Sequence, residues 1–217
     1  SESIVLRGHV LGINTVAISS DGRWLVTGSV DHTVRLWDLT APDPAAEPIV
    51  LRGHDGDIET VAISPDNHWL VTSGDDTTVH LWDLTAPGWT AEPLVLRGHE
   101  RSIGTVAISP DNRWLVTGSW DATARLWNLT ASDPAAAPIV LRGHEGIIRA
   151  VAFSPDNHWL VTGSNDGTAR LWDLTAPNPA SESIVLYGHV LGINTVAISS
   201  DGRWLVIGSW EGTVWLW

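Results

Sequence analysis

Short runs of apolar and β-branched residues alternate with turn residues along the whole chain. In the first 45 residues, Ser20-Asp21-Gly22 and Asp31-His32 supply turn chemistry between such runs. Runs of this length and composition, bounded by turn residues, predict an all-β chain with four strands in this segment. The expected strands cover residues 3–6 (SIVL), 15–19 (TVAIS), 24–29 (WLVTGS) and 33–38 (TVRLWD).

The four-strand pattern recurs five times at a period of 45 residues. Each unit has a Gly-His pair after its first strand, and a Trp follows each His by 28 residues. A fixed period of this size indicates a repeat architecture, in which neighbouring units bury one another's apolar faces. The Trp residues are Trp37, Trp82, Trp127, Trp172 and Trp217, of which the first, second and fourth precede an Asp.

Connectors rich in Pro and Ala, such as residues 39–48, separate the units. Pro at this density excludes a central strand and favours an ordered surface loop. We therefore expect one domain over residues 1–217, with an N-terminal strand at residues 3–7 that closes a terminal blade within the chain or in another chain. Its repeats cover residues 1–45, 46–90, 91–135, 136–180 and 181–217.

The order of these residues resembles that of one known family. Gly-His, then Ser-Pro-Asp, then an Asp six residues before Trp-Asp, within a 45-residue unit, is similar to the WD-repeat (Trp-Asp repeat) β-propeller family. The resemblance covers essentially the whole chain. It implies a β-propeller with five four-stranded blades per chain, in which the first strand of each repeat is the outer strand of the preceding blade.

The resemblance also implies a hydrogen-bonded tetrad in each of the first four repeats. It joins the His after Gly, a Thr of the third strand, the turn Asp and the Trp. His, Asp and Thr would also suit a nucleophilic triad, but four copies at a strict period favour a structural role. The sets are His9, Thr27, Asp31 and Trp37; His54, Thr72, Asp76 and Trp82; His99, Thr117, Asp121 and Trp127; and His144, Thr162, Asp166 and Trp172.

The fifth repeat departs from this pattern. Ile207 stands where the Thr is expected, and Glu211 where the Asp is expected, beside His189 and Trp217. We expect this blade to be less rigid or reshaped around a contact. The other histidines, His32, His68, His80 and His158, share no metal-site spacing and are expected at the surface.

Composition narrows the possible partners. The chain has no Cys, no Lys and a formal net charge of −13. This charge disfavours nucleic acid and anionic membrane surfaces, which are bound through basic residues. There is no apolar stretch of membrane-spanning length and no signal-like N-terminus. We expect a cytoplasmic protein without metal or other cofactor, because no non-repeated catalytic or metal-binding group is visible.

Function is expected in the positions that differ between repeats. The second repeat carries an acidic group, Asp57, Glu59 and Asp75, whereas the third and fifth place Trp120 and Trp210 at a turn, and the fourth carries Arg149. Exposed Trp is a frequent interface anchor, so these six residues are candidate partner-binding residues. The alternative to a binding surface is that these solvent-exposed positions vary by sequence drift without a function. A Ca²⁺ site is disfavoured because the acidic group lacks a spaced ligand loop.

The two ends of the chain are nearly identical in sequence. Residues 1–37 and 181–217 differ at six positions, which indicates blade duplication. Closure within one chain predicts five blades, whereas exchange between chains predicts eight or ten. We favour a homodimer, because cyclic symmetry is usual for exchanged elements. The candidate chain–chain contacts are Ile4, Leu6, Trp210, Trp215 and Trp217.

Three functions remain open. The first is a non-enzymatic, bacterial interaction or scaffolding propeller that self-assembles into a closed multi-chain ring. The second is an engineered or excised array with no selected ligand. The third and weakest is a propeller enzyme, since fold alone does not decide function.

Overall fold

The computed structural model describes residues 3–86 and 92–217. All regular secondary structure in these residues is β-strand, which confirms the all-β class. Among them, no helix is long and apolar enough to cross a membrane. The chain divides into two compact units, residues 1–98 and 99–217, and each unit is described by itself.

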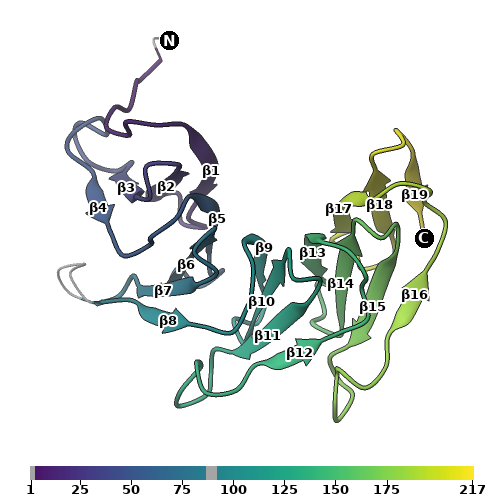
Figure 1. Ribbon diagram of the computed structural model, residues 1–217. Coiled ribbons are helices and arrows are strands. Elements are labelled where there is room, and N and C mark those ends of the chain that lie inside the picture. Colours follow the sequence, from purple (N-terminus) through teal and green to yellow (C-terminus); the bar gives the residue numbers. More distant parts are fainter. Residues whose placement is uncertain (1–2, 87–91) are drawn as a thin grey trace. The chain divides into compact units, whose positions relative to one another are not determined.

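The first unit contains two four-stranded antiparallel sheets whose strands lie side by side in chain order (Figure 1). The first sheet consists of β1 (Ile13–Ile18), β2 (Trp24–Ser29), β3 (Val34–Asp38) and β4 (Ile49–Leu51). The second consists of β5 (Ile58–Ile63), β6 (Trp69–Gly74), β7 (Val79–Asp83) and β8 (Leu94–Leu96). Each sheet takes its fourth strand from the following repeat, as the family resemblance implied.

The second unit contains three antiparallel sheets. Two of them have four strands: β9 (Ile103–Ile108), β10 (Trp114–Ser119), β11 (Ala124–Asn128) and β12 (Ile139–Leu141); then β13 (Ile148–Phe153), β14 (Trp159–Ser164), β15 (Ala169–Asp173) and β16 (Ile184–Leu186). The last sheet has β17 (Ile193–Ile198), β18 (Leu205–Ser209) and β19 (Val214–Leu216). The fifth sheet therefore has three strands in the described residues, and its fourth strand is the one expected from residues 3–7 of this or another chain.

The strand predicted at residues 3–7 does not form in the described structure. The same letters, SIVL, recur at residues 183–186, where Ile184–Leu186 form β16 by pairing with β15. This sequence therefore becomes a strand when a neighbouring strand supplies hydrogen bonds, and remains extended coil otherwise. Whether residues 3–7 close a terminal blade stays a prediction.

Neighbouring sheets within each unit pack face to face through apolar residues. In the first unit, Val26 and Leu36 of the first sheet and Ile58 of the second belong to one buried cluster. In the second unit, Ile148 and Ile193 make the corresponding contacts between successive sheets. A Cβ on Gly118 would come within 2.7 Å of the side chains of Ile148 and Thr105, so this strand position has to be small.

One bulge recurs at the start of the first strand of every sheet. In β1 the pairing with β2 shifts between Ile13 and Thr15, which leaves Asn14 as the extra residue. A bulge of this kind re-aims a side chain away from the regular alternation. The equivalent extra residues are Glu59, Gly104, Arg149 and Asn194.

Candidate functional site

In the first four repeats, one chain of hydrogen bonds joins the predicted His, Thr, Asp and Trp. In the third repeat, His99 Nδ1 lies 2.8 Å from Asp121 Oδ2, and His99 Nε2 lies 2.8 Å from Thr117 Oγ1. The indole Nε1–H of Trp127 donates to the same Thr oxygen at 3.1 Å. The same three contacts occur in the first, second and fourth repeats.

Two further groups complete the set and were missed by sequence reasoning. The hydroxyl of Thr123 donates to Asp121 Oδ1 at 2.6 Å, and the backbone N–H of Glu100 donates to Asp121 Oδ2 at 3.0 Å. A Thr two residues after the acidic residue occurs in every repeat, so the signal was present in the sequence. The Asp121 carboxylate thereby ties the turn between β10 and β11 to the loop that follows Gly98-His99.

These contacts keep the Asp carboxylates ionised. Burial alone raises the pKa of Asp121, but hydrogen bonds from His99 and Thr123 outweigh it and hold that pKa well below its usual range. The same balance lowers the pKa of Asp31, Asp76 and Asp166. A buried carboxylate with several donors is a stable anion, so each His is held by a charge-assisted hydrogen bond.

The fifth repeat keeps the contact between His and the acidic residue. It loses the two contacts that the Thr hydroxyl makes with His and Trp in the other repeats. Glu211 lies 2.8 Å from His189 Nδ1, and hydrogen bonds from Thr213 and His189 lower the pKa of Glu211 to about 2. Ile207 is buried at the Thr position, so within the described residues the buried Nε2 of His189 has no hydrogen-bond partner. Trp217 is 45% exposed, against 2% for Trp172.

His80 lies in the core, so the prediction that it lies at the surface is wrong. It is only 4% exposed, and its ring stacks on His54 with centroids 3.7 Å apart. The sequence gives no sign that this position is buried, because the equivalent residues of three other repeats are the charged Arg35, Arg125 and Arg170. Burial, followed by the nearby His54, lowers the pKa of His80 to about 4, so the buried ring is neutral at pH 7.

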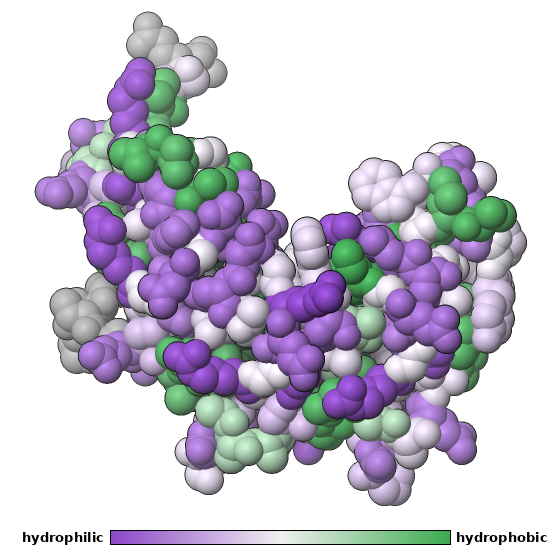
Figure 2. Space-filling model, in the orientation of Figure 1, coloured by the Kyte–Doolittle hydropathy of each residue, from purple (hydrophilic) through white to green (hydrophobic). Residues whose placement is uncertain are grey.

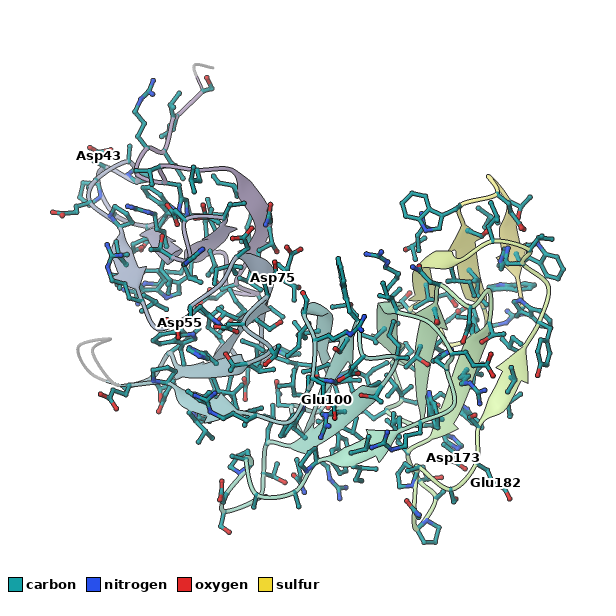
Figure 3. All side chains as sticks on the ribbon, viewed as in Figure 1. Asp43, Asp55, Asp75, Glu100, Asp173 and Glu182 are labelled. Atoms are coloured by element: carbon teal, nitrogen blue, oxygen red, sulfur yellow. The ribbon has the colours of Figure 1, made fainter. Side chains whose placement is uncertain are left out.

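The acidic group of the second repeat gathers as the sequence suggested. Ligand atoms of Asp57, Glu59 and Asp75 lie within 4.8 Å of one another. His32 of the preceding repeat approaches Asp57, with Nε2 and Oδ1 3.3 Å apart. Asp75 is labelled in Figure 3 beside the first strands of this unit. The group is an anionic spot on the first unit, where Glu59 occupies the bulge.

His54, Asp76 and His80 also offer ligand atoms within 4.8 Å of one another. Both ring nitrogens of His54 are already bonded to Asp76 and Thr72, and the two imidazoles are stacked with an interplanar angle of 17°. Two stacked rings cannot both direct an in-plane lone pair at one ion. This group therefore suits packing better than metal binding.

Trp120 and Arg149, from successive repeats of the second unit, contact each other at the surface. The Arg149 guanidinium carbon lies 5.2 Å from the centre of the Trp120 ring, and Arg149 Nε donates to Asn165 Oδ1 at 3.3 Å. Trp120 is 41% exposed, and a Cβ on Gly104 would come within 3.3 Å of its indole nitrogen. The Gly at this bulge therefore leaves room for the indole.

The other candidate contact residues are spread over both units. Trp210 is 63% exposed on the turn before β19, and Trp215 and Trp217 are exposed on or beside β19. Figure 2 shows hydrophobic side chains at the surface in this part of the chain. Ile4 is exposed and Leu6 half-buried in the first unit, which also holds the acidic group. Trp120, Arg149 and Trp210 belong to the second unit.

Comparison with known proteins identifies each repeat. The family "WD domain, G-beta repeat" matches residues 1–38, 47–83, 92–128, 138–173 and 181–217. One similar relative is the ribosome biogenesis protein bop1 of Danio rerio, 42% identical over 40 residues, or 18% of this chain and 5% of that protein. Another is the ribosome biogenesis protein ERB1 of Debaryomyces hansenii, 49% identical over 37 residues, or 17% of this chain and 5% of that protein.

A third relative is the target of rapamycin complex subunit wat1 of Schizosaccharomyces pombe. It is 41% identical over 39 residues, which is 18% of this chain and 12% of that protein. Each similarity spans about one repeat and a small part of the relative. The relatives therefore identify the repeat type.

Replacing the shared hydroxyl should destabilise the fold. Thr162→Val keeps the side-chain shape but leaves His144 Nε2 and the Trp172 indole N–H without their common partner in the core. Because each unsatisfied buried group costs about 1–3 kcal/mol, we expect the free energy of unfolding in urea to fall by about 2 kcal/mol or more. Ile207→Val, at the equivalent position, has no such hydroxyl to lose and should cost about 1 kcal/mol. Equal losses would contradict this role.

Burial of His80 should make stability sensitive to mild acid. The unfolded chain protonates this His below a pH of about 6.5. Folded His80 stays neutral down to about pH 4. The free energy of unfolding should therefore fall as the pH drops from about 6.5 to 4. His80→Arg, which copies the neighbouring repeats, should flatten this slope in urea titrations, whereas His158→Arg at a half-buried site near the surface should not. An unchanged slope in His80→Arg would refute the assignment.

Proposed function

We propose that this chain, which belongs to the WD-repeat family, is a non-enzymatic protein-interaction scaffold that binds its partner through the loops around the bulged residues. One observation carries the proposal. The repeated polar residues are tied up in hydrogen bonds within the blades, whereas the residues at the bulge and at the facing turn change from repeat to repeat and include exposed Trp120 and Trp210.

The geometry of the His–Thr–Asp sets argues against catalysis. Thr72, Thr117 and Thr162 are completely buried, and each hydroxyl oxygen is contacted by both a His ring and a Trp indole. A nucleophile must reach a substrate, and a buried oxygen with two partners cannot do so. The sets are therefore proposed as structural tetrads that rigidify each blade.

A protein is the favoured class of partner. The net charge of −13 opposes phosphate backbones and anionic lipid, whereas exposed Trp and Arg are the residue types enriched at protein interfaces. The relative from Schizosaccharomyces pombe is by its name a subunit of a complex, which agrees with this class. We propose a cytoplasmic location, in keeping with a chain that has no Cys.

Self-assembly is a second part of the proposal. Val214, Leu216 and Trp217 on or beside β19 are all exposed, as are Ile4 and Val5. The register of β15 with β16 aligns Leu171 with Ile184. Transferred to the equivalent positions of the other repeats, that register aligns Leu216 of β19 with Ile4. We propose that residues 3–7 of a second chain add to β19 in this register and so form a homodimer.

The partner-binding role can be tested by comparing three exposed Trp residues. We expect Trp120→Ala and Trp210→Ala to lose capture of a protein that wild-type chain retains from lysate, because these side chains anchor the interface. Trp204→Ala should retain it, since this equally exposed Trp precedes β18 at the opposite end of the strand. Capture that survives both loop substitutions, or that Trp204→Ala also abolishes, would contradict the proposed surface.

The assembly can be tested by light scattering after size-exclusion chromatography. Wild-type chain should have twice its 23.4 kDa monomer mass, since two strand additions close the pair. Val5→Pro should yield a monomer, because Pro cannot donate in the new ladder. As a control, Pro44→Ala in the first connector should leave the mass at that of the dimer. A Pro at Val10 would not serve, because the N–H of Val10 donates to Asp31. A monomeric wild-type chain would refute the homodimer.

A further inference from the structure

A hollow of about 370 Å³ lies between the third and fourth repeats of the second unit. One wall is the turn that carries Trp120 and Ala122, and the other is the loop from Glu145 to Ile147. Glu100 lies at its rim and is labelled in Figure 3. This volume is at the lower end of the range of about 300–1,000 Å³ for ligand pockets, which suits a side chain better than a large cofactor.

The residues that line the hollow are of two kinds, apolar and anionic. Trp120, Ala122 and Ile147 supply apolar surface, while Glu100 and Glu145 supply carboxylates. Neither glutamate forms a salt bridge within the described part of the chain, whose ion pairs are all made by other acidic residues. An occupant with an aliphatic stem and a positive end would satisfy both kinds of surface.

The charge balance remains negative when every lining group is counted. Arg101 adds one positive charge at the rim, and the ionised Asp121 at the base offsets it. Arg149 lies over the Trp120 ring and does not line the hollow. The lining residues therefore carry a net charge of about −2. Arg125 and Arg142, which line an adjacent hollow with Glu100, and Arg149 over Trp120 reduce the negative potential without reversing the sign of the lining.

The frame that presents these glutamates is rigid. The backbone N–H groups of Glu100 and Glu145 donate to Asp121 and Asp166 at 3.0 and 2.9 Å. Trp120 is held in the same way, since its backbone N–H donates to the Ser102 carbonyl at 2.9 Å. A preformed site loses little conformational entropy when an occupant binds.

The first two repeats carry an ion pair at the equivalent place. His32, at the position equivalent to Ala122, reaches across to Asp57 of the next repeat at 3.3 Å. A nitrogen-bearing side chain thus contacts an acidic residue of the neighbouring loop. Between the third and fourth repeats Ala122 replaces this His and Ile147 replaces its acidic partner, so the ion pair is absent and the hollow is open.

We propose that this hollow binds a single lysine or arginine side chain of the partner protein. The stem lies against Trp120 and Ile147, and the ammonium or guanidinium group lies between Glu100 and Glu145. The inference rests on the proposed scaffold function, because it names the chemistry of the partner that the same surface recognises. It requires a partner segment that is basic at one position and needs no other feature of its sequence.

The test uses a defined probe and one side chain as reporter. Acetyl-Ala-Ala-Arg-Ala-Ala-amide and its Lys analogue are titrated into ¹⁵N-labelled chain, and the Trp120 indole N–H signal, assigned through Trp120→Phe, is followed by NMR. We expect a saturable shift for both peptides. The analogue with neutral citrulline should bind about tenfold more weakly, because it keeps the shape and loses the charge.

Paired charge variants complete the experiment. Glu100→Gln with Glu145→Gln should weaken Arg-peptide binding about tenfold, whereas Glu47→Gln with Glu182→Gln removes the same charge from exposed sites elsewhere and should leave it unchanged. No saturable shift, equal binding of citrulline, or indifference to the Glu100 and Glu145 pair overturns the inference. If these fail while Trp120→Ala still abolishes partner capture, the cation site is wrong and the scaffold surface stands. If the peptides bind while capture ignores Trp120, the scaffold surface is wrong.

Discussion

The ionised Asp beside each buried His is the interaction on which the blades depend. In the third repeat, Asp121 accepts hydrogen bonds from His99, Thr123 and the backbone of Glu100. It thereby connects the turn between β10 and β11 to the loop after Gly98-His99. His99 in turn bonds Thr117, whose hydroxyl also accepts from the Trp127 indole, so one carboxylate orders the two strands β10 and β11 and two loops. Such a fully satisfied polar network specifies a single packing of the blade.

The same network releases other positions for function. Once the loops are fixed by repeated residues, the residue at the bulge can change without loss of the fold. It is Glu59 in the second repeat, where it joins an acidic group, and Arg149 in the fourth, where it stacks on Trp120. Specific chemistry therefore collects on these loops, which a rigid frame holds in place.

The fifth repeat shows the consequence of losing part of the network. Ile207 buries a hydrocarbon at the Thr position, so His189 Nε2 is unsatisfied within the described residues. Glu211 still reaches the ring, and it also accepts hydrogen bonds from the backbone of Val190 and Leu191. The acidic contact to the loop is thus kept while the contact to the Trp is lost, and this agrees with the greater exposure of Trp217.

The sequence by itself determined the all-β class and the five-fold repeat, because period and turn chemistry are local properties of the chain. The family resemblance supplied the His, Thr, Asp and Trp of each polar set, whereas the second Thr and the backbone N–H that complete the set were seen only in the structure. The sequence could not place His80, since the same position is Arg in three other repeats and only packing against His54 reveals the buried ring. Nor could it show that Asn14, Glu59, Gly104, Arg149 and Asn194 are bulged, because a bulge is defined by the neighbouring strand. The hollow beside Trp120 likewise follows only from the tertiary structure, because its walls come from residues of two different repeats that the packing of neighbouring sheets brings together.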